Sequence, residues 1–179
     1  MKALALIVLI IATIWCTGNI VLVAIGAPGI FQHAPPHATH IERDIAGAIF
    51  GDLLRRWTIV VDMGLLPVLA TLAVVTAGAL IGTRRYLQAA FYLVMIVGIG
   101  SAHLWSRSIL HEAVATAPPV DSKQPYSAEQ RQVFNALHAR STRVYSIETA
   151  LLLLFVLGVG IGLSLREEQQ PASASPSSH

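Results

Sequence analysis

The sequence predicts an all-α membrane protein: a bundle of four transmembrane helices, with amphipathic surface helices in the two long loops. Three observations lead to this fold class. Hydrophobic residues make up 54% of the 179 residues, charged residues make up only 12%, and the apolar residues fall into four blocks. Soluble domains carry about 25% charged residues, so this chain has too few to cover a water-soluble globule. The blocks show no alternation of polar and apolar residues, which favours helices over a β-barrel.

Each apolar block is long enough to cross a bilayer as one helix, because a helix needs roughly 20 residues to span a hydrocarbon core about 30 Å thick. The predicted spans are residues 3–26, 57–81, 86–105 and 145–165. Together they define one membrane domain over residues 1–166, and the Ser-, Pro- and Ala-rich residues 167–179 are expected to form a disordered tail. A cleaved signal peptide is the alternative for the first block, but that block exceeds the usual apolar length of about 7–15 residues.

The connections between the blocks differ in length. Residues 82–85 alone join the second block to the third, so these two helices form an antiparallel hairpin. The first long connection begins with a turn-rich stretch from Ala27 to Pro36. Apolar residues then recur at helical spacing up to Trp57, which predicts a helix on the membrane surface that leads into the second span.

The second long connection, residues 106–144, contains a helix start signal. Ser127 and Gln130 have the spacing of a capping box. An apolar stripe follows on a helix that is expected to run on into the fourth span: Val133, Phe134 and Leu137.

Three ionisable residues lie inside the predicted spans, near the membrane face that carries the long loops. Asp62 lies roughly 7–8 Å into the second span at about 1.5 Å per residue. His103 lies at the end of the third span and Glu148 at the start of the fourth. Arg107 and His111 follow His103 at steps of four, on one helical face. Charge in hydrocarbon is costly, so we interpret one group of residues as a candidate polar layer inside the bundle: Asp62, His103, Arg107 and Glu148.

A structural interpretation stands beside this functional one. An acidic residue close to the membrane interface can simply form an ion pair, and Arg56, Arg107 and Arg143 flank the three spans in sequence. The sequence contains no nucleophile–base pair, phosphate-binding loop or Cys-x-x-Cys motif. It therefore identifies no catalytic residue and favours, without requiring, a non-enzymatic role.

The histidines are the candidates for binding a metal ion, since imidazole is a ligand of Zn, Cu, Ni and Fe. His33, His37 and His40 have the spacing of one helical face, but Pro35 and Pro36 interrupt a helix there, so a joint site would lie in a loop. Solvated histidines without a ligand are the simpler interpretation.

A haem held by two histidines is the second cofactor that the sequence leaves open. His103 is the one histidine inside a predicted span, so its partner would be His111 or His138. The choice between a metal ion, a haem and no cofactor is left open at this point.

The expected partner is the lipid bilayer, because a net charge of +2 is too balanced to suggest nucleic acid. Pairs of small residues four apart let helices approach closely. They serve packing within the bundle, or contact with a second copy or a membrane partner protein: Gly78 and Gly82, Gly98 and Ala102, Gly158 and Gly162.

Four short motifs resemble one family. They are Trp15-Cys-Thr-Gly18, Ala27-Pro-Gly-Ile-Phe31, Ala46-Gly-Ala-Ile-Phe50 and Leu137-His138. Together they resemble the four-span bacterial membrane proteins grouped with transmembrane protein 205, a family of unknown function. That family is similar to copper-resistance D-type membrane proteins and to a haem-linked membrane oxidase family. The resemblance implies metal-resistance or haem-linked work, with His138 as the matching residue, and it implies no catalytic role.

An even number of spans places both termini on the same side of the membrane. Arg84 and Arg85 form a dense positive segment beside two spans, which favours the cytoplasm for that side. The opposite side carries more Lys and Arg, but they are spread over the surface helices. We therefore expect the chain in the plasma (inner) membrane with both termini in the cytoplasm.

We expect a reporter that is active only in the cytoplasm to be active when fused after His179, because the hairpin arginines retain that side of the protein. Reporter activity and the amount of fusion protein in the membrane fraction are measured together. A silent fusion on a protein that accumulates normally would reverse the orientation.

Overall fold

The computed structural model describes residues 2–32, 40–116 and 127–168. Its elements follow in this order: α1 (Lys2–Val21), η1 (Leu22–Gly26), α2 (Ala27–Gln32), α3 (His40–Val60), η2 (Val61–Leu65), α4 (Leu66–Gly82), α5 (Tyr86–Thr116) and α6 (Ala128–Glu168). The two η elements are single π-helical turns. These segments contain no strand, and the predicted all-α class is confirmed.

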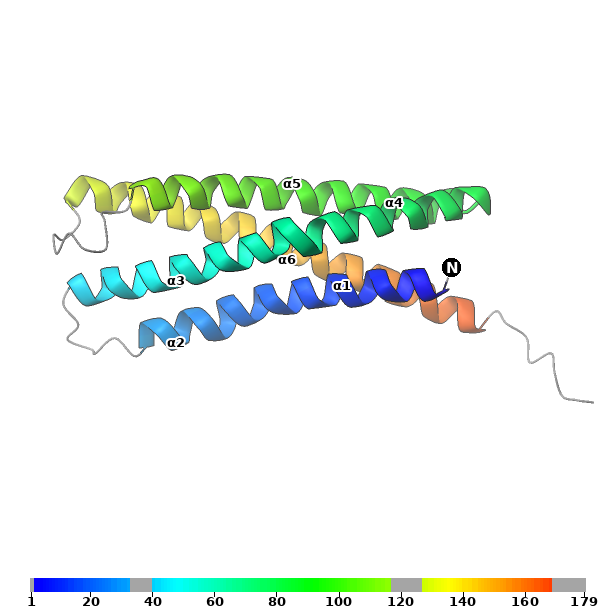
Figure 1. The fold of residues 1–179 in the computed structure, drawn as a ribbon, viewed down its shortest axis with the longest axis horizontal. Coiled ribbons are helices and arrows are strands. Elements are labelled where there is room, and N and C mark those ends of the chain that lie inside the picture. The colour runs from blue at the N-terminus through cyan, green and yellow to red at the C-terminus, as the bar shows by residue number, and fades with distance from the viewer. Residues whose placement is uncertain (1, 33–39, 117–126, 169–179) are drawn as a thin grey trace, which may run out of the picture.

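The elements join into four continuous helical rods that lie side by side along the long axis (Figure 1). Each rod contains a stretch that is long and apolar enough to cross a membrane: Lys2–Ile30, Ile49–Gly82, Tyr86–Ala113 and Ala128–Leu165. Many large apolar side chains on these stretches point outward, as lipid-facing side chains do. The chain therefore fits a multi-pass membrane protein.

Both π turns lie just before a proline. The Leu66 N–H donates to the Val61 carbonyl, and the Ala27 N–H donates to the Leu22 carbonyl. In a regular α-helix a proline ring clashes with the carbonyl four residues earlier, and the wider π turn relieves that clash at Pro67. The rods therefore continue, and the turn-rich stretch predicted from Ala27 is wrong as far as Gln32, where α2 ends.

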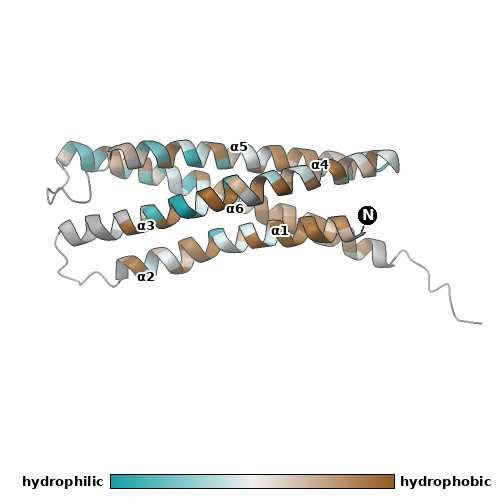
Figure 2. Cartoon of the chain, in the orientation of Figure 1, coloured by the Kyte–Doolittle hydropathy of each residue, from teal (hydrophilic) through white to brown (hydrophobic). Residues whose placement is uncertain are grey.

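Three rods extend beyond the membrane-spanning region. Figure 2 shows hydrophilic residues toward the long-loop ends of α5 and α6 and part-way along α3, and mostly apolar residues toward the hairpin ends. The rods 40–82 and 128–168 each contain about 40 residues, so each is about 60 Å long, twice the hydrocarbon thickness. The helix predicted on the membrane surface before the second span thus continues in line with that span, because the backbone stays helical through η2.

The extension of α5 and α6 has a small core of its own, made by Ile109, Leu137 and Val144. At its far end, the Ser127 N–H donates to Gln130 Oε1 at 2.9 Å and the Gln130 N–H donates to Ser127 Oγ at 3.1 Å. The predicted capping box is therefore confirmed. In the predicted apolar stripe only Leu137 is buried, whereas Phe134 is half-buried and Val133 is exposed.

The predicted hairpin between the second and third spans is confirmed. Residues 83–85 turn between α4 and α5, and Arg84 takes the left-handed conformation with φ of 60°. The Arg85 N–H donates to the Leu80 carbonyl at 2.9 Å, which caps the end of α4.

Both ends of the described chain lie at the hairpin end of the bundle (Figure 1). Helix α6 continues to Glu168, so the first two residues of the predicted tail 167–179 are helical, and its remainder lies outside the described residues.

The half of the bundle near the hairpin has an apolar core in which aromatic rings meet a glycine. Phe155 of α6 lies 5.5 Å from Tyr92 of α5 in a T-shaped contact and 5.9 Å from Phe91, measured between ring centroids. A Cβ atom at Gly158 would collide with the Phe91 ring, whereas a Cβ at Gly162 would meet nothing within 4 Å. Only Gly158 of this small-residue pair is thus needed for packing within the chain.

We expect Gly158→Ala to lower the thermal stability of the detergent-purified protein and Gly162→Ala to leave it equal or higher. Both changes favour the helix by about 1 kcal/mol, but only the first must displace a packed ring, at a cost of about 1–3 kcal/mol. The unfolding midpoints of the two variants provide the measurement. Equal midpoints would contradict this packing role of Gly158.

Candidate functional site

A buried layer of polar side chains joins all four rods. The central residue that each rod contributes (Asn19, Asp62, His103 or Glu148) lies 17–20 residues from the rod's end near the hairpin, which is roughly 25–30 Å along the helix. That distance approaches the full hydrocarbon thickness, so the layer lies near the membrane face of the long loops. Its members are Trp15 and Asn19 from α1, Trp57 from α3, Asp62 from η2, His103 and Arg107 from α5, and Tyr145, Glu148 and Thr149 from α6.

His103 lies at the centre of this polar layer, between two carboxylates. Its Nε2 atom lies 3.1 Å from Asp62 Oδ1, and its Nδ1 atom lies 3.5 Å from Glu148 Oε2. The ring also makes a T-shaped contact with the Trp15 indole at 5.3 Å between centroids. The structure therefore brings together the three ionisable residues that the sequence placed at similar depth.

The ionisable side chains Arg107, Asp62, His103 and Glu148 form a line that leads inward from the surface. Arg107 Nη1 lies 3.2 Å from Asp62 Oδ2 and continues the line to the exposed side. Side-chain exposure falls steadily along it: 57% for Arg107, 17% for Asp62, 6% for His103 and 2% for Glu148. The deepest charged group is thus the one most completely removed from water.

The two oxygens of Glu148 have different surroundings. Oε1 accepts hydrogen bonds from Trp15 Nε1 and from Asn19 Nδ2, both at 3.1 Å. Oε2 is buried and has no hydrogen-bond partner, since the His103 contact is too long to count as one. One oxygen is therefore fixed by two N–H donors, and the other faces His103 with its acceptor capacity unused.

The Asn19 side chain links several members of the layer, because all of its donor and acceptor positions are used in contacts with them. Its Oδ1 accepts from Trp57 Nε1 at 2.8 Å and from Tyr145 Oη at 2.9 Å. Its Nδ2 donates to Glu148 Oε1 and lies 3.4 Å from Thr149 Oγ1. An amide has two donors and two acceptor sites, so this fully buried side chain ties α1 to both α3 and α6.

Sequence reasoning missed the neutral members of the layer. Asn19 is the only side-chain amide in the first apolar block, and that was the one available signal. The Trp-x-x-Gly motif has a local explanation as well. Trp15 donates to Glu148, and Gly18 packs against the Trp57 indole so closely that a Cβ atom would collide with the ring.

Two of the three arginines that flank the spans in sequence pair with acidic residues, and these partners differ. Arg107 pairs with Asp62, as the structural interpretation of the sequence proposed. Arg56 instead pairs with Asp52 at 2.7 Å on the exposed face of α3, and Arg143 is exposed on α6. None of the contacts described for Glu148 involves an arginine, and the one side chain in contact with it that can carry a positive charge is His103, when its ring is protonated.

Of the other histidines, His111 and His138 are the two whose side chains the structure describes, and it describes no contact between either of them and the layer. His111 and His138 are exposed, and the His138 ring stacks on Phe134. The predicted loop site falls on His33 and His37, which lie outside the described residues, and on His40, which begins α3 but whose side chain is not described.

The geometry offers limited support for the metal and haem interpretations. Within residues 2–32, 40–116 and 127–168, no group of three or more His, Cys, Asp or Glu side chains is placed to hold a metal ion. The two carboxylates lie against opposite nitrogens of one imidazole, so they do not converge on a common point. For the same reason neither nitrogen of His103 is directed toward a haem iron.

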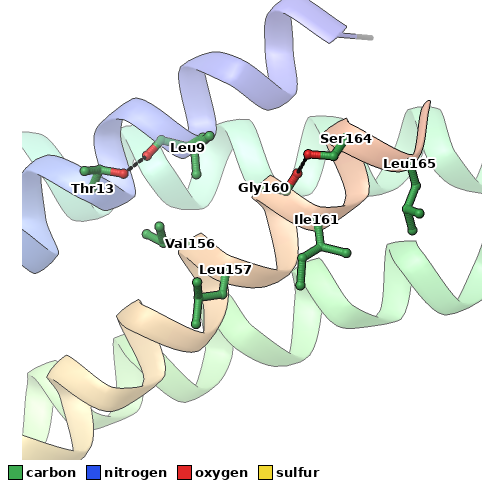
Figure 3. A pocket seen from close by; sticks show the side chains of 8 residues that line it. All are labelled: Leu9, Thr13, Val156, Leu157, Gly160, Ile161, Ser164 and Leu165. Carbon is green, nitrogen blue, oxygen red and sulfur yellow. Dashed lines mark hydrogen bonds between the residues drawn. The ribbon is translucent and has the colours of Figure 1, made fainter. Parts of the chain in front are cut away.

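A shallow groove lies between α1 and α6 (Figure 3). The Thr13 hydroxyl donates to the Leu9 carbonyl and the Ser164 hydroxyl donates to the Gly160 carbonyl, so both hydroxyl hydrogens are used within their own helices. The other side chains of the groove are aliphatic: Leu9, Val156, Leu157, Ile161 and Leu165. The groove therefore suits lipid acyl chains, and its lining residues supply no ionisable side chain for catalysis or ion binding.

Comparisons of the chain with protein-family models, with curated proteins and with solved structures give no match. The polar layer therefore has to be interpreted from its own contacts.

We expect Asn19→Leu to destabilise the detergent-purified protein by about 2 kcal/mol, because interhelical hydrogen bonds in membranes average about 0.6 kcal/mol each and four contacts are lost. Thr76→Val is the matched control, since this buried hydroxyl bonds only to the Leu72 carbonyl of its own helix. Unfolding midpoints compare the two variants. A control effect as large as that of Asn19→Leu would show that the amide does not hold the layer together.

Proposed function

We propose that the chain is a non-enzymatic integral membrane protein that handles an ion or a small solute at the polar layer. The observation that supports this proposal is Glu148 Oε2, a buried acceptor without a hydrogen-bond partner. It lies at the inner end of the line of charged side chains that begins at the exposed Arg107. Buried acceptors are rarely left unpaired, and ionisable groups inside membranes commonly mark ion or solute sites. An ion or a hydrogen-bond donor would supply the missing partner.

The proposed orientation decides from which side the ion or solute arrives. The ends of the described chain lie with Arg84 and Arg85 at the end opposite to the polar layer. With both termini in the cytoplasm of the inner membrane, the layer opens toward the outer face. We therefore propose that the ion or solute reaches the layer from outside the cell.

The resemblance to proteins grouped with transmembrane protein 205, and the metal-resistance role that it implies, belong to this proposal. The layer uses Trp15 and Gly18 of the first motif. A second copy or a membrane partner protein would find room on three glycines whose Cβ positions meet no other atoms within 4 Å: Gly78, Gly82 and Gly162.

A complementation experiment tests the function. We expect a strain that lacks the protein to lose tolerance to one of a panel of stresses, namely acid, alkali and metal salts. Wild-type protein and Asp52→Asn should restore tolerance, and Glu148→Gln should lose at least tenfold of the restored survival. Asp52 is the matched control because it pairs with arginines on the exposed face of α3, away from the layer.

The amount of each variant in the membrane fraction must equal that of the wild type for the comparison to count. A Glu148→Gln protein that accumulates normally and restores every phenotype would refute ion or solute handling. The layer would then serve only to hold the four helices together, and the protein would be a structural or assembly partner in the membrane.

A further inference from the structure

We infer that the ion held at the polar layer is a proton, carried by His103 as an imidazolium and exchanged with one side of the membrane only. This inference rests on the proposed function and names the ion. It follows from the charge balance of the layer, the position of the ring between two acceptors, and the distribution of polar groups on either side.

The charge balance favours one more proton in the layer. Asp62 and Glu148 supply two carboxylates, whereas Arg107 supplies one guanidinium and reaches only Asp62. With a neutral His103 the group carries a net charge of −1, and Glu148 is a buried carboxylate without a counter-ion. An unpaired buried charge is strongly unfavourable, whereas one proton on the ring makes the group neutral.

The position of the ring fits a proton in particular. A neutral imidazole has one N–H donor, so it would turn a lone pair toward one of the two carboxylates. An imidazolium directs an N–H toward Asp62 Oδ1 and another toward Glu148 Oε2, at N–O separations of 3.1 and 3.5 Å. A metal ion needs several ligands around one point, whereas a proton does not. The two carboxylates do not converge on one point, which fits a proton.

The other groups around His103 supply no competing charge. From α1, Trp15 and Asn19 are neutral and donate to Glu148 Oε1. From α6, Tyr145 is titratable, but its hydroxyl donates to Asn19 Oδ1. The titratable groups in direct contact with the ring are therefore Asp62 from η2 and Glu148 from α6.

The route of exchange runs through Asp62, which is half-buried and lies beside the exposed Arg107. A proton from water forms an O–H bond on the Asp62 carboxylate. That bond then breaks as an N–H bond forms at His103 Nε2, so a proton moves and no electron is transferred. Release follows the same steps in reverse.

No comparable route leads to the hairpin face. Residues 63–81 and 149–165 contain no acidic, basic or histidine side chain, and neither do residues 86–102. Their buried positions are mostly apolar, among them Leu69, Ile99 and Phe155. About 25 Å of apolar bundle thus separates the layer from the other face, so the site takes up a proton without conducting it.

Nitrogen NMR of the full chain in lipid nanodiscs tests the protonation state directly. With ¹⁵N-labelled histidine, His103 is assigned by the signals that disappear in His103→Gln. We expect both ring nitrogens of His103 to carry a proton at pH 7. Glu148→Gln should lower the ratio of doubly protonated to neutral ring about tenfold or more, because it removes an adjacent opposite charge. Asp52→Asn should leave this ratio unchanged.

A neutral His103 in the wild-type protein would overturn the inference, and this result does not depend on whether any variant folds. Addition of Mn²⁺ then separates the two proposals. Broadening of the His103 signals by Mn²⁺ in the wild type, absent in Glu148→Gln, would retain ion handling and reject the proton. A neutral ring that Mn²⁺ leaves sharp would remove the support for both.

Proton conduction in liposomes tests the one-sided access. With a potassium diffusion potential set by valinomycin, we expect liposomes that contain the wild-type protein to admit protons no faster than those that contain His103→Gln. A faster flux in the wild type would overturn the one-sided route.

Discussion

The structure depends on one buried carboxylate. Glu148 of α6 is buried against α1 and α5, where water cannot solvate it, so the protein must supply its hydrogen-bond donors and its counter-charge. Trp15 and Asn19 of α1 supply the donors, and His103 of α5 lies against the remaining oxygen. Asp62 then holds the far side of the imidazole. A single acidic side chain thus accounts for why α1, α5, α6 and the turn η2 meet at one level.

Much of the fold could be predicted from the sequence because lipid imposes simple rules. The lengths of the apolar blocks predict the four spans, and the short connection between the second and third blocks predicts the hairpin. The spacing of Ser127 and Gln130 predicts the start of α6. The continuity of the rods through Pro28 and Pro67 was not predictable in this way. It depends on π turns, in which one extra residue is accommodated before each proline, and hydropathy carries no signal for them.

The site was predictable only in its charged members. Asp62, His103 and Glu148 stand out because ionisable residues are rare in apolar blocks, and counting residues from the span ends gives their depth. Asn19, Trp57 and Tyr145 do not stand out, because neutral polar and aromatic residues are common near membrane interfaces. Their roles depend on the rotation of each helix about its axis. That rotation is set by contacts such as Gly18 against the Trp57 ring.

The rods that continue past the membrane have a mechanical consequence. The rods that contain α3 and α6 pass from the apolar half of the bundle into its polar end without a break, so a tilt of either rod about a pivot at the level of His103 would move its far tip. A tilt of about 10° at the pivot would displace the tip of a 30 Å arm by about 5 Å, using the helix rise of about 1.5 Å per residue. A small rearrangement at the level of the polar layer would therefore be transmitted to the ends of α3 and α6 beyond it.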